Sequence, residues 1–139
     1  MTPDRSSILA LQRATHATLQ RLAAELVDLD LTASEINALA NLGDRRGRSV
    51  SELAAEVGTR PTTFTSVLDR LERRGHITRG ARPGDRRAVV IELTASGRHA
   101  AATIRRALAE LEDRALGPLP DRTVDAFHLV LRALTDASS

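Results

Sequence analysis

The chain has 139 residues, enough for one folded domain with a core of its own, and it carries a net charge of +2. Phe64 and Phe127 are its only aromatic residues, and the absence of cysteine excludes disulfides, thiol redox switches and cysteine zinc sites. It has no apolar run long enough to cross a bilayer and no signal-peptide segment, so we expect a cytoplasmic protein with no membrane partner.

The positive charge is concentrated in one central block. Residues 60–87 hold eight arginines and three acids, a net charge of +5, whereas residues 1–59 carry −2 and residues 88–139 carry −1. A basic block in an otherwise nearly neutral chain favours a polyanion as partner. The alternative is a charged face that only meets water.

The first half of the chain predicts helices. Residues 7–29 carry apolar side chains at helical spacing, which predicts one long helix. Thr32 is followed three residues later by Glu35, a capping-box pattern that predicts the start of a second helix. Gly43 is expected to end this helix.

A short helix and a longer one follow across a glycine turn. Ser49 and Glu52 form a second capping-box pattern, and Gly58 is expected to end the short helix that they begin. The next helix is expected from about 62 to 74. Its apolar residues repeat at i, i+3, i+4 and i+7, as in a helix with one buried face: Phe64, Val67, Leu68 and Leu71.

The pattern then changes to that of a β-hairpin. Residues 76–79 predict a short strand and 88–93 a stronger one rich in β-branched side chains. Residues 80–87 between them predict a loop with a basic tip. After Thr94 a long helix is expected up to the Gly-Pro-Leu-Pro break at 117–120, and a last helix follows it.

The short helix, the glycine turn and the helix after it form a helix-turn-helix, whose second helix normally lies in the DNA major groove. Hydroxyl and guanidinium groups suit phosphates and base edges. The alternative is an ordinary amphipathic surface helix. The candidate DNA contacts on this second, recognition helix are Arg60, Thr62, Thr63, Thr65, Ser66, Arg70 and Arg73.

The predicted hairpin carries a second group of candidate DNA contacts, Arg82, Asp85, Arg86 and Arg87. Arginines near a turn suit the narrow minor groove, where negative potential is concentrated. Asp85 is expected to hold Arg87 by a salt bridge and so to fix its direction. The alternative is a solvated loop that only keeps the protein soluble.

Several motifs together resemble the MarR family of bacterial regulators: Leu-Asp-Arg-Leu-Glu-Arg-Arg-Gly at 68–75, Gly-Asp-Arg-Arg at 84–87 and Leu-Thr-Ala-Ser-Gly at 93–97. The resemblance covers 32–97 and implies a mainly α fold with a small β-hairpin wing, a winged helix-turn-helix. It implies that Arg70 lies near the major groove and that Arg87, braced by Asp85, reaches the minor groove. Many members carry arginine where this chain has Ser66, so base contacts are expected to shift toward Arg70, Thr62 and Thr63.

The helices that flank this core, 7–29 and 97–136 within a single domain of 139 residues, fit the family's dimerisation region by position and length. They carry more apolar surface than a small winged core covers, which favours a homodimer; the alternative is packing within one chain. The candidate dimerisation residues are Ile8, Leu11, Leu19, Leu111, Phe127, Leu131 and Leu134.

Family members often bind small amphipathic effectors, and an aliphatic pocket lined by Leu19, Leu22 or Ile36 is where we look for such a ligand here. Its identity is not predicted. The four histidines have no helical zinc-pair spacing, and there is no nucleophile elbow, phosphate loop or other catalytic pattern. We therefore expect no cofactor, no metal and no enzymatic activity.

Two functions from different classes remain open. The first is a transcription regulator, expected to be a repressor, that binds double-stranded DNA as a homodimer on a pseudo-palindromic operator. The second is a winged-helix module that binds proteins without specific DNA binding. The basic block at 60–87 favours the first.

Overall fold

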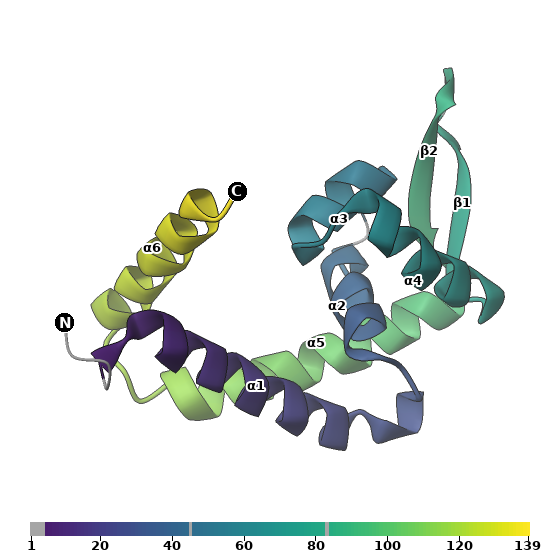
Figure 1. Cartoon of the computed structure of the whole chain (residues 1–139). Helices are drawn as coiled ribbons and strands as arrows, with labels where there is room; N and C mark the ends of the chain where they lie inside the picture. Colours follow the sequence, from purple (N-terminus) through teal and green to yellow (C-terminus); the bar gives the residue numbers. More distant parts are fainter. Residues whose placement is uncertain (1–4, 45, 83) are drawn as a thin grey trace. The chain divides into compact units, whose positions relative to one another are not determined.

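The computed structural model describes residues 5–44, 46–82 and 84–139. Helices make up most of this part of the chain, and a hairpin interrupts them (Figure 1). Two compact units are formed, Met1–Ala107 and Leu108–Ser139, with one long helix contributing to both. The elements in chain order are α1 (Ser7–Glu25), the 3-10 turn η2 (Val27–Leu29), α2 (Ala33–Leu42), α3 (Val50–Val57), α4 (Pro61–Arg73), β1 (Ile77–Arg82), β2 (Asp85–Leu93), α5 (Ala95–Leu116) and α6 (Asp121–Ala137).

Both predicted capping boxes are present. The Thr32 hydroxyl accepts from the Glu35 N–H at 3.2 Å, and the Glu35 carboxylate accepts from the Thr32 N–H at 3.2 Å. Ser49 and Glu52 repeat the arrangement at the start of α3, at 3.1 and 3.3 Å. Gly58 ends α3 with φ of 84°, a left-handed conformation that favours glycine. The predicted starts of α2 and α3 are therefore confirmed.

The core of the first unit is almost entirely aliphatic. All four residues of the predicted apolar stripe on α4 are buried, which confirms that helix and its orientation. They pack in one core with side chains from α2, α3, the hairpin and α5. The largest fully buried side chains are Phe64, Leu39, Leu42, Leu53, Leu68, Leu71, Ile77, Ile91 and Ile104.

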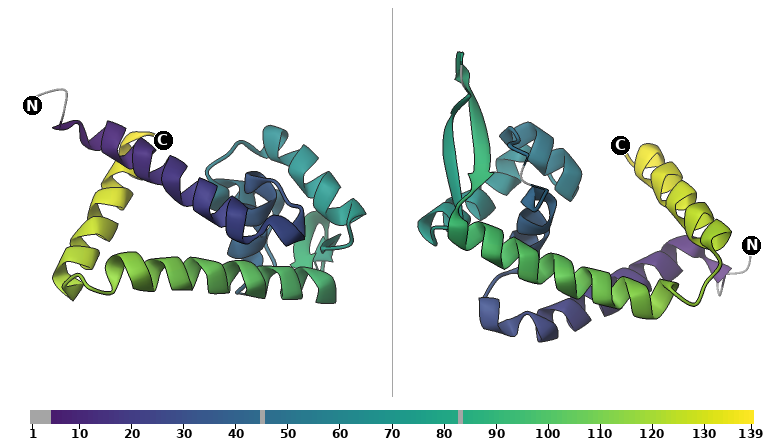
Figure 2. Two further views of the ribbon diagram at one scale, coloured as in Figure 1. Left: turned by 90° about the horizontal axis from the view of Figure 1, so that it is seen from below. Right: turned by 180° about the vertical axis from the view of Figure 1, so that it is seen from behind.

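The hairpin has longer strands than the sequence predicts. β1 and β2 form an antiparallel hairpin (Figure 2). Ile77 lies opposite Leu93 and Arg82 opposite Asp85, with an irregularity in the pairing at Ala81/Arg82. The expected loop over residues 80–87 is therefore wrong: most of these residues are in the strands. Their glycine and arginine content indicated a loop, but pairing across the hairpin satisfies their backbone groups and extends the ladder.

The base of the hairpin is anchored on both sides. The backbone of Arg48, just before α3, pairs with that of Ile91 through two hydrogen bonds of 3.3 and 2.7 Å. On the other side, the Thr94 hydroxyl caps α5 by accepting from the Gly97 N–H at 3.0 Å. A Cβ at Gly97 would lie 1.9 Å from the carbonyl oxygen of His76, so only glycine allows this close approach.

The second unit buries far less. α6 has no buried side chain, although its apolar residues follow helical spacing. Phe127 is 43% exposed, and Leu129 and Val130 are exposed as well. A helix of this kind presents an apolar face that its own unit leaves uncovered.

Candidate nucleic-acid interface

The side of α4 opposite the buried stripe carries Thr62, Ser66, Asp69 and Arg73, which follow one another at i, i+4, i+7 and i+11. This spacing places them in one row along the helix, here called the outer line. Thr62, Ser66 and Arg73 are exposed, and the Asp69 side chain is 48% exposed. Thr63 and Thr65 flank the row and are also exposed. These residues, all but Asp69 predicted as contacts, form one accessible surface.

The start of α4 is open. Arg60 is the N-cap residue, yet its side chain makes no capping hydrogen bond, and Pro61 follows as the first helical residue. The backbone N–H groups of Thr62 and Thr63, in the first turn, therefore lie at the positive end of the helix dipole, and the Arg60 side chain does not cap them. Backbone groups in this arrangement bind phosphate oxygens well.

Two hydroxyls, one beside the outer line and one on it, already donate their protons within α4. Thr65 Oγ1 donates to the Pro61 carbonyl at 3.0 Å, and Ser66 Oγ donates to the Thr63 carbonyl at 3.3 Å. Their oxygen lone pairs remain available, so both side chains present acceptors on the surface of α4. Base amino groups in the major groove are donors of the matching kind.

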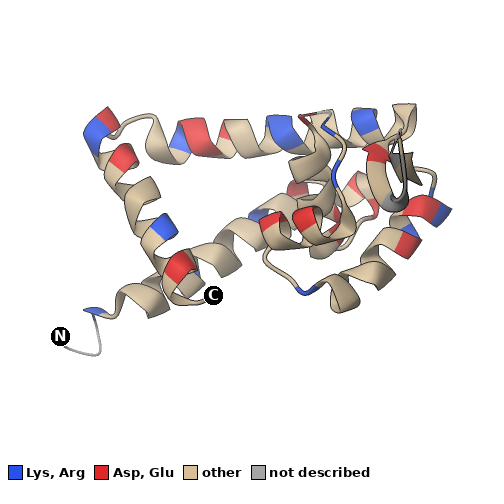
Figure 3. Cartoon of the chain, turned by 90° about the horizontal axis from the view of Figure 1, so that it is seen from above, with Lys and Arg blue, Asp and Glu red and all other residues tan. Residues whose placement is uncertain are grey.

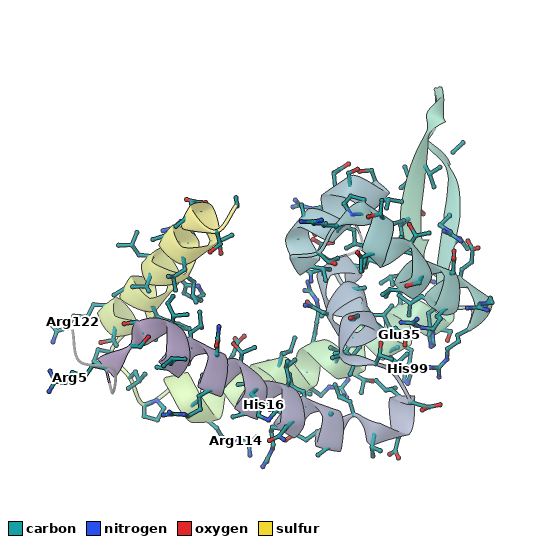
Figure 4. All side chains as sticks on the ribbon, viewed as in Figure 1. Arg5, His16, Glu35, His99, Arg114 and Arg122 are labelled. Carbon is teal, nitrogen blue, oxygen red and sulfur yellow. The ribbon has the colours of Figure 1, made fainter. Side chains whose placement is uncertain are left out.

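The two candidate arginines of α4 lie in different surroundings. Arg73 is exposed, and its Nε donates to the Asp69 carbonyl at 3.3 Å. Arg70 lies toward α2, where its Nε is 3.6 Å from Oε1 of Glu35. Glu35 is labelled in Figure 4. The Glu35 side chain is 3% exposed and that of Arg70 is 42% exposed. Arg70 as a base contact stays a prediction, but it has a competing role as the counter-ion of a buried carboxylate.

Sequence analysis missed Arg79 on β1. Its Nη2 lies 2.8 Å from Asp69 Oδ1 and 3.0 Å from Glu72 Oε1, and its Nε lies 3.1 Å from Glu72 Oε2. These hydrogen bonds lower the pKa of Glu72 and raise that of Arg79. The acids share α4 with its arginines (Figure 3). Arg79 therefore joins the base of the hairpin to α4.

Two further arginines serve the fold. Arg48, 9% exposed, lies 2.7 Å from Glu56 and pairs with both oxygens of Asp44 at 2.8 and 2.5 Å. The hydrogen bond from Arg48 holds the pKa of Asp44 well below its usual range. Arg74, at the end of α4, donates to the backbone carbonyls of Asp30 and Leu29. Sequence analysis gave Arg48 no role.

The wing contacts remain predictions. The backbone of Arg82 belongs to β1, and those of Asp85, Arg86 and Arg87 belong to β2. Their side chains lie outside the described part of the structure, and so does the expected Asp85–Arg87 salt bridge. The described backbone does place all four beside the turn of the hairpin.

A pocket of about 220 Å³ lies between α1, α2 and the α3–α4 region. Leu19 lines it as expected, but Leu22 and Ile36 do not: Leu22 is buried, and the α2 residues facing the pocket are Ala33, Ser34 and Asn37. Its other lining residues are Val57, Thr59, Thr63, Phe64 and Val67. The pocket therefore reaches α4 itself.

The described residues add neither a metal site nor a membrane-spanning helix. No group of three or more histidines, acids or cysteines that could hold a metal ion occurs among them. None of the helices in residues 5–44, 46–82 and 84–139 is long and apolar enough to cross a membrane.

The chain is similar to named regulators of transcription. It is 34% identical over 71 residues to the uncharacterized HTH-type regulator YfiV of Bacillus subtilis, covering 51% of this chain and 44% of YfiV. It is 33% identical over 95 residues to TtmR of Methylorubrum extorquens, covering 68% of this chain and 49% of TtmR. The chain thus matches about half the length of these two relatives. With the repressor NicR of Pseudomonas putida it shares 29% identity over 110 residues, 79% of this chain and 70% of NicR.

Solved structures and the family model agree with this likeness. CouR of Rhodococcus jostii, bound to p-coumaroyl-CoA, has a TM-score of 0.87 at 23% identity, covering 97% of this chain and 95% of CouR. The S. aureus MepR–DNA complex has a TM-score of 0.82 at 20% identity, covering 96% and 99%. At identities of 20% and 23%, the structural similarity establishes that this chain shares the fold. Residues 31–89, which hold most of the winged helix-turn-helix, match the model of the MarR family.

Proposed function

We propose that this protein regulates transcription by binding double-stranded DNA, with α4 in the major groove and the hairpin in the minor groove. The observation that carries the proposal is the outer line of α4 beside its uncapped start, an exposed surface of hydroxyls, arginine and free N–H groups. MepR was solved as a DNA complex, and NicR is a named repressor, which supports repression as the outcome. The cytoplasm is the location that we propose.

We propose further that the DNA-binding form is a homodimer. α6 leaves Phe127 exposed and Leu131 and Leu134 only half-buried, and α1 leaves Ile8 and Leu19 exposed. A second copy is the partner that would remove these apolar surfaces from water. Two copies would read two half-sites, so the operator is expected to be pseudo-palindromic.

The pocket beside α4 is where we propose that a small effector binds. Leu19, Phe64 and Val67 give it apolar walls, and Asn37 and Thr63 add polar groups. CouR and NadR were solved with p-coumaroyl-CoA and 4-hydroxyphenylacetate, which supports a small organic ligand as the class. Because Thr63 and Val67 belong to α4, a ligand there changes the surroundings of the recognition helix. We propose no enzymatic activity.

Selection of bound sequences from random duplex DNA tests the proposal. The expected result is enrichment of a two-fold symmetric site, and affinity that falls steeply with salt because phosphate contacts release counterions. Arg87→Ala is expected to weaken binding to the selected site strongly while the dimer stays intact. A flat salt response, or no enriched sequence, would reject DNA binding and favour the protein-interaction module.

A further inference from the structure

Asp69 lies in an unusual place for a DNA-binding protein. It is the third residue of the outer line, between Ser66 and Arg73, and its carboxylate is 48% exposed. A carboxylate facing phosphates or base acceptors opposes binding, because like charges and acceptors at close range repel. Glu72, one turn further along α4, adds a second negative charge at 41% exposure.

Arg79, on the hairpin, forms ion pairs with both acids. Its Nη2 is shared between Asp69 and Glu72, and its Nε makes a second hydrogen bond to Glu72. The Arg79 side chain is only 25% exposed, less than either acid, so the guanidinium lies between the hairpin and α4. The cluster carries a net charge of −1 with Arg79 and −2 without it.

We propose that Arg79 is a positioning residue for DNA binding, which neutralises Asp69 on the outer line and holds the hairpin against α4. This inference rests on the proposed function. Arg79 lies in β1 opposite Ile91, whose backbone is also bound to Arg48, so the guanidinium is attached to the anchored base of the hairpin. Because Arg79 contacts two residues that lie three positions apart on α4, it also fixes the direction of β1 relative to α4. The same side chain thereby sets the charge of one DNA-binding element and the direction of the other.

The competing explanation is an ordinary surface ion pair. Exposed pairs contribute little to folding, so a purely structural Arg79 would leave DNA affinity unchanged when it is replaced. A direct phosphate contact by Arg79 is a second alternative. In that case replacing Asp69 by a neutral residue would not restore the DNA affinity that is lost with Arg79.

A cycle of variants separates these explanations, with affinity for the selected duplex measured by fluorescence anisotropy. Arg79→Met is expected to weaken binding by about tenfold, because the charge on the outer line is exposed to phosphates. The double variant Arg79→Met/Asp69→Asn is expected to recover the part of this loss that the uncompensated charge of Asp69 causes. The matched control Arg79→Met/Glu72→Gln has the same net charge but retains Asp69, and is expected to recover less. Arg79→Lys, which keeps the charge, should stay within about threefold of the parent protein.

Equal affinity of the parent protein and Arg79→Met, or no recovery with Asp69→Asn, would overturn the inference. Thermal unfolding of each variant shows whether a loss of affinity comes from misfolding. If Arg79→Met misfolds, Arg79→Lys serves as the test. Because lysine keeps the positive charge, an affinity of Arg79→Lys as poor as that of Arg79→Met would also refute neutralisation of Asp69. Failure of the proposed function gives a different result, since the parent protein itself would then not bind duplex DNA at low salt.

Discussion

α4 and α6 are both amphipathic, and the structure uses them in different ways. α4 has 13 residues and buries four side chains, whereas the 17 residues of α6 bury none. The two aromatic residues of the chain show the same contrast, because Phe64 on α4 is 1% exposed and Phe127 on α6 is 43% exposed. Helical spacing predicts that a helix has an apolar face, but it does not tell whether the same chain or another covers that face.

The largest expected effect tests this contrast with one substitution at two places. Phe64→Ala is expected to lower the free energy of unfolding by about 3–5 kcal/mol, because it leaves a cavity in a closed core. Phe127→Ala is expected to act through dimerisation, so its destabilising effect on urea unfolding should be small at low protein concentration and should increase as the concentration rises. Equal, concentration-independent losses at both sites would show that α6 is covered by its own chain.

A pair of leucines on α6 sharpens the same comparison. Leu131 belongs to the apolar stripe, whereas Leu129, two positions away on another side of the helix, is 61% exposed. Leu131→Asp is expected to weaken the dimer by about 3 kcal/mol, since an interface would bury an unpaired charge. Leu129→Asp is the matched control and should leave the dimer intact. Sedimentation velocity over a range of concentrations measures dimer dissociation for both variants. Dissociation caused by Leu129→Asp and not by Leu131→Asp would place the interface on the opposite side of α6.

Within the winged unit, Arg73 and Arg70 offer a smaller comparison. Arg73→Ala is expected to cost about 1–3 kcal/mol of affinity for the selected duplex, because the side chain lies on the outer line. Arg70→Ala should cost less affinity and more stability, since it leaves Glu35 buried without its nearby cation. Binding and urea unfolding measured on the same preparations decide between them. A larger loss of affinity for Arg70→Ala would restore the sequence-based assignment of base reading to Arg70.

The smallest expected effect concerns the caps. Thr32→Ala removes the hydroxyl that accepts from the Glu35 N–H and is expected to cost about 1 kcal/mol of stability. Thr18→Ala, within α1, is the control, because its exposed hydroxyl bonds only to the Thr15 carbonyl. Thermal unfolding compares the two. A similar shift for both would mean that the capping box contributes little.

Local patterns in the sequence were sufficient to predict the helices that they span. The capping pairs Thr32–Glu35 and Ser49–Glu52 and the apolar stripe of α4 each lie within one helix, and the structure confirms them. The hairpin was harder to predict. Its strands include residues 80–82 and 85–87, whose composition is typical of loops, because pairing between strands overrides local propensity.

The basic block shows what a sequence does not reveal. Its arginines predicted a polyanion partner, yet Arg79 pairs with acids 7 and 10 residues earlier, and Arg74 bonds to carbonyls 44 and 45 residues away. Counting charges gives the net value of a segment but not which of them remain accessible. Arg70 and Arg79 become distinguishable from Arg73 only when the fold brings Glu35, Asp69 and Glu72 beside them.

The separation of the two sides of α4 has a consequence for how such a protein can change. Folding depends on Phe64, Val67, Leu68 and Leu71, whereas the row on the opposite side makes almost no contact with the core. Under the proposed function, substitutions at Thr62, Ser66 or Arg73 are therefore expected to alter the preferred nucleotide sequence without unfolding the scaffold. A library varied at these three positions is a practical starting point for variants with new targets.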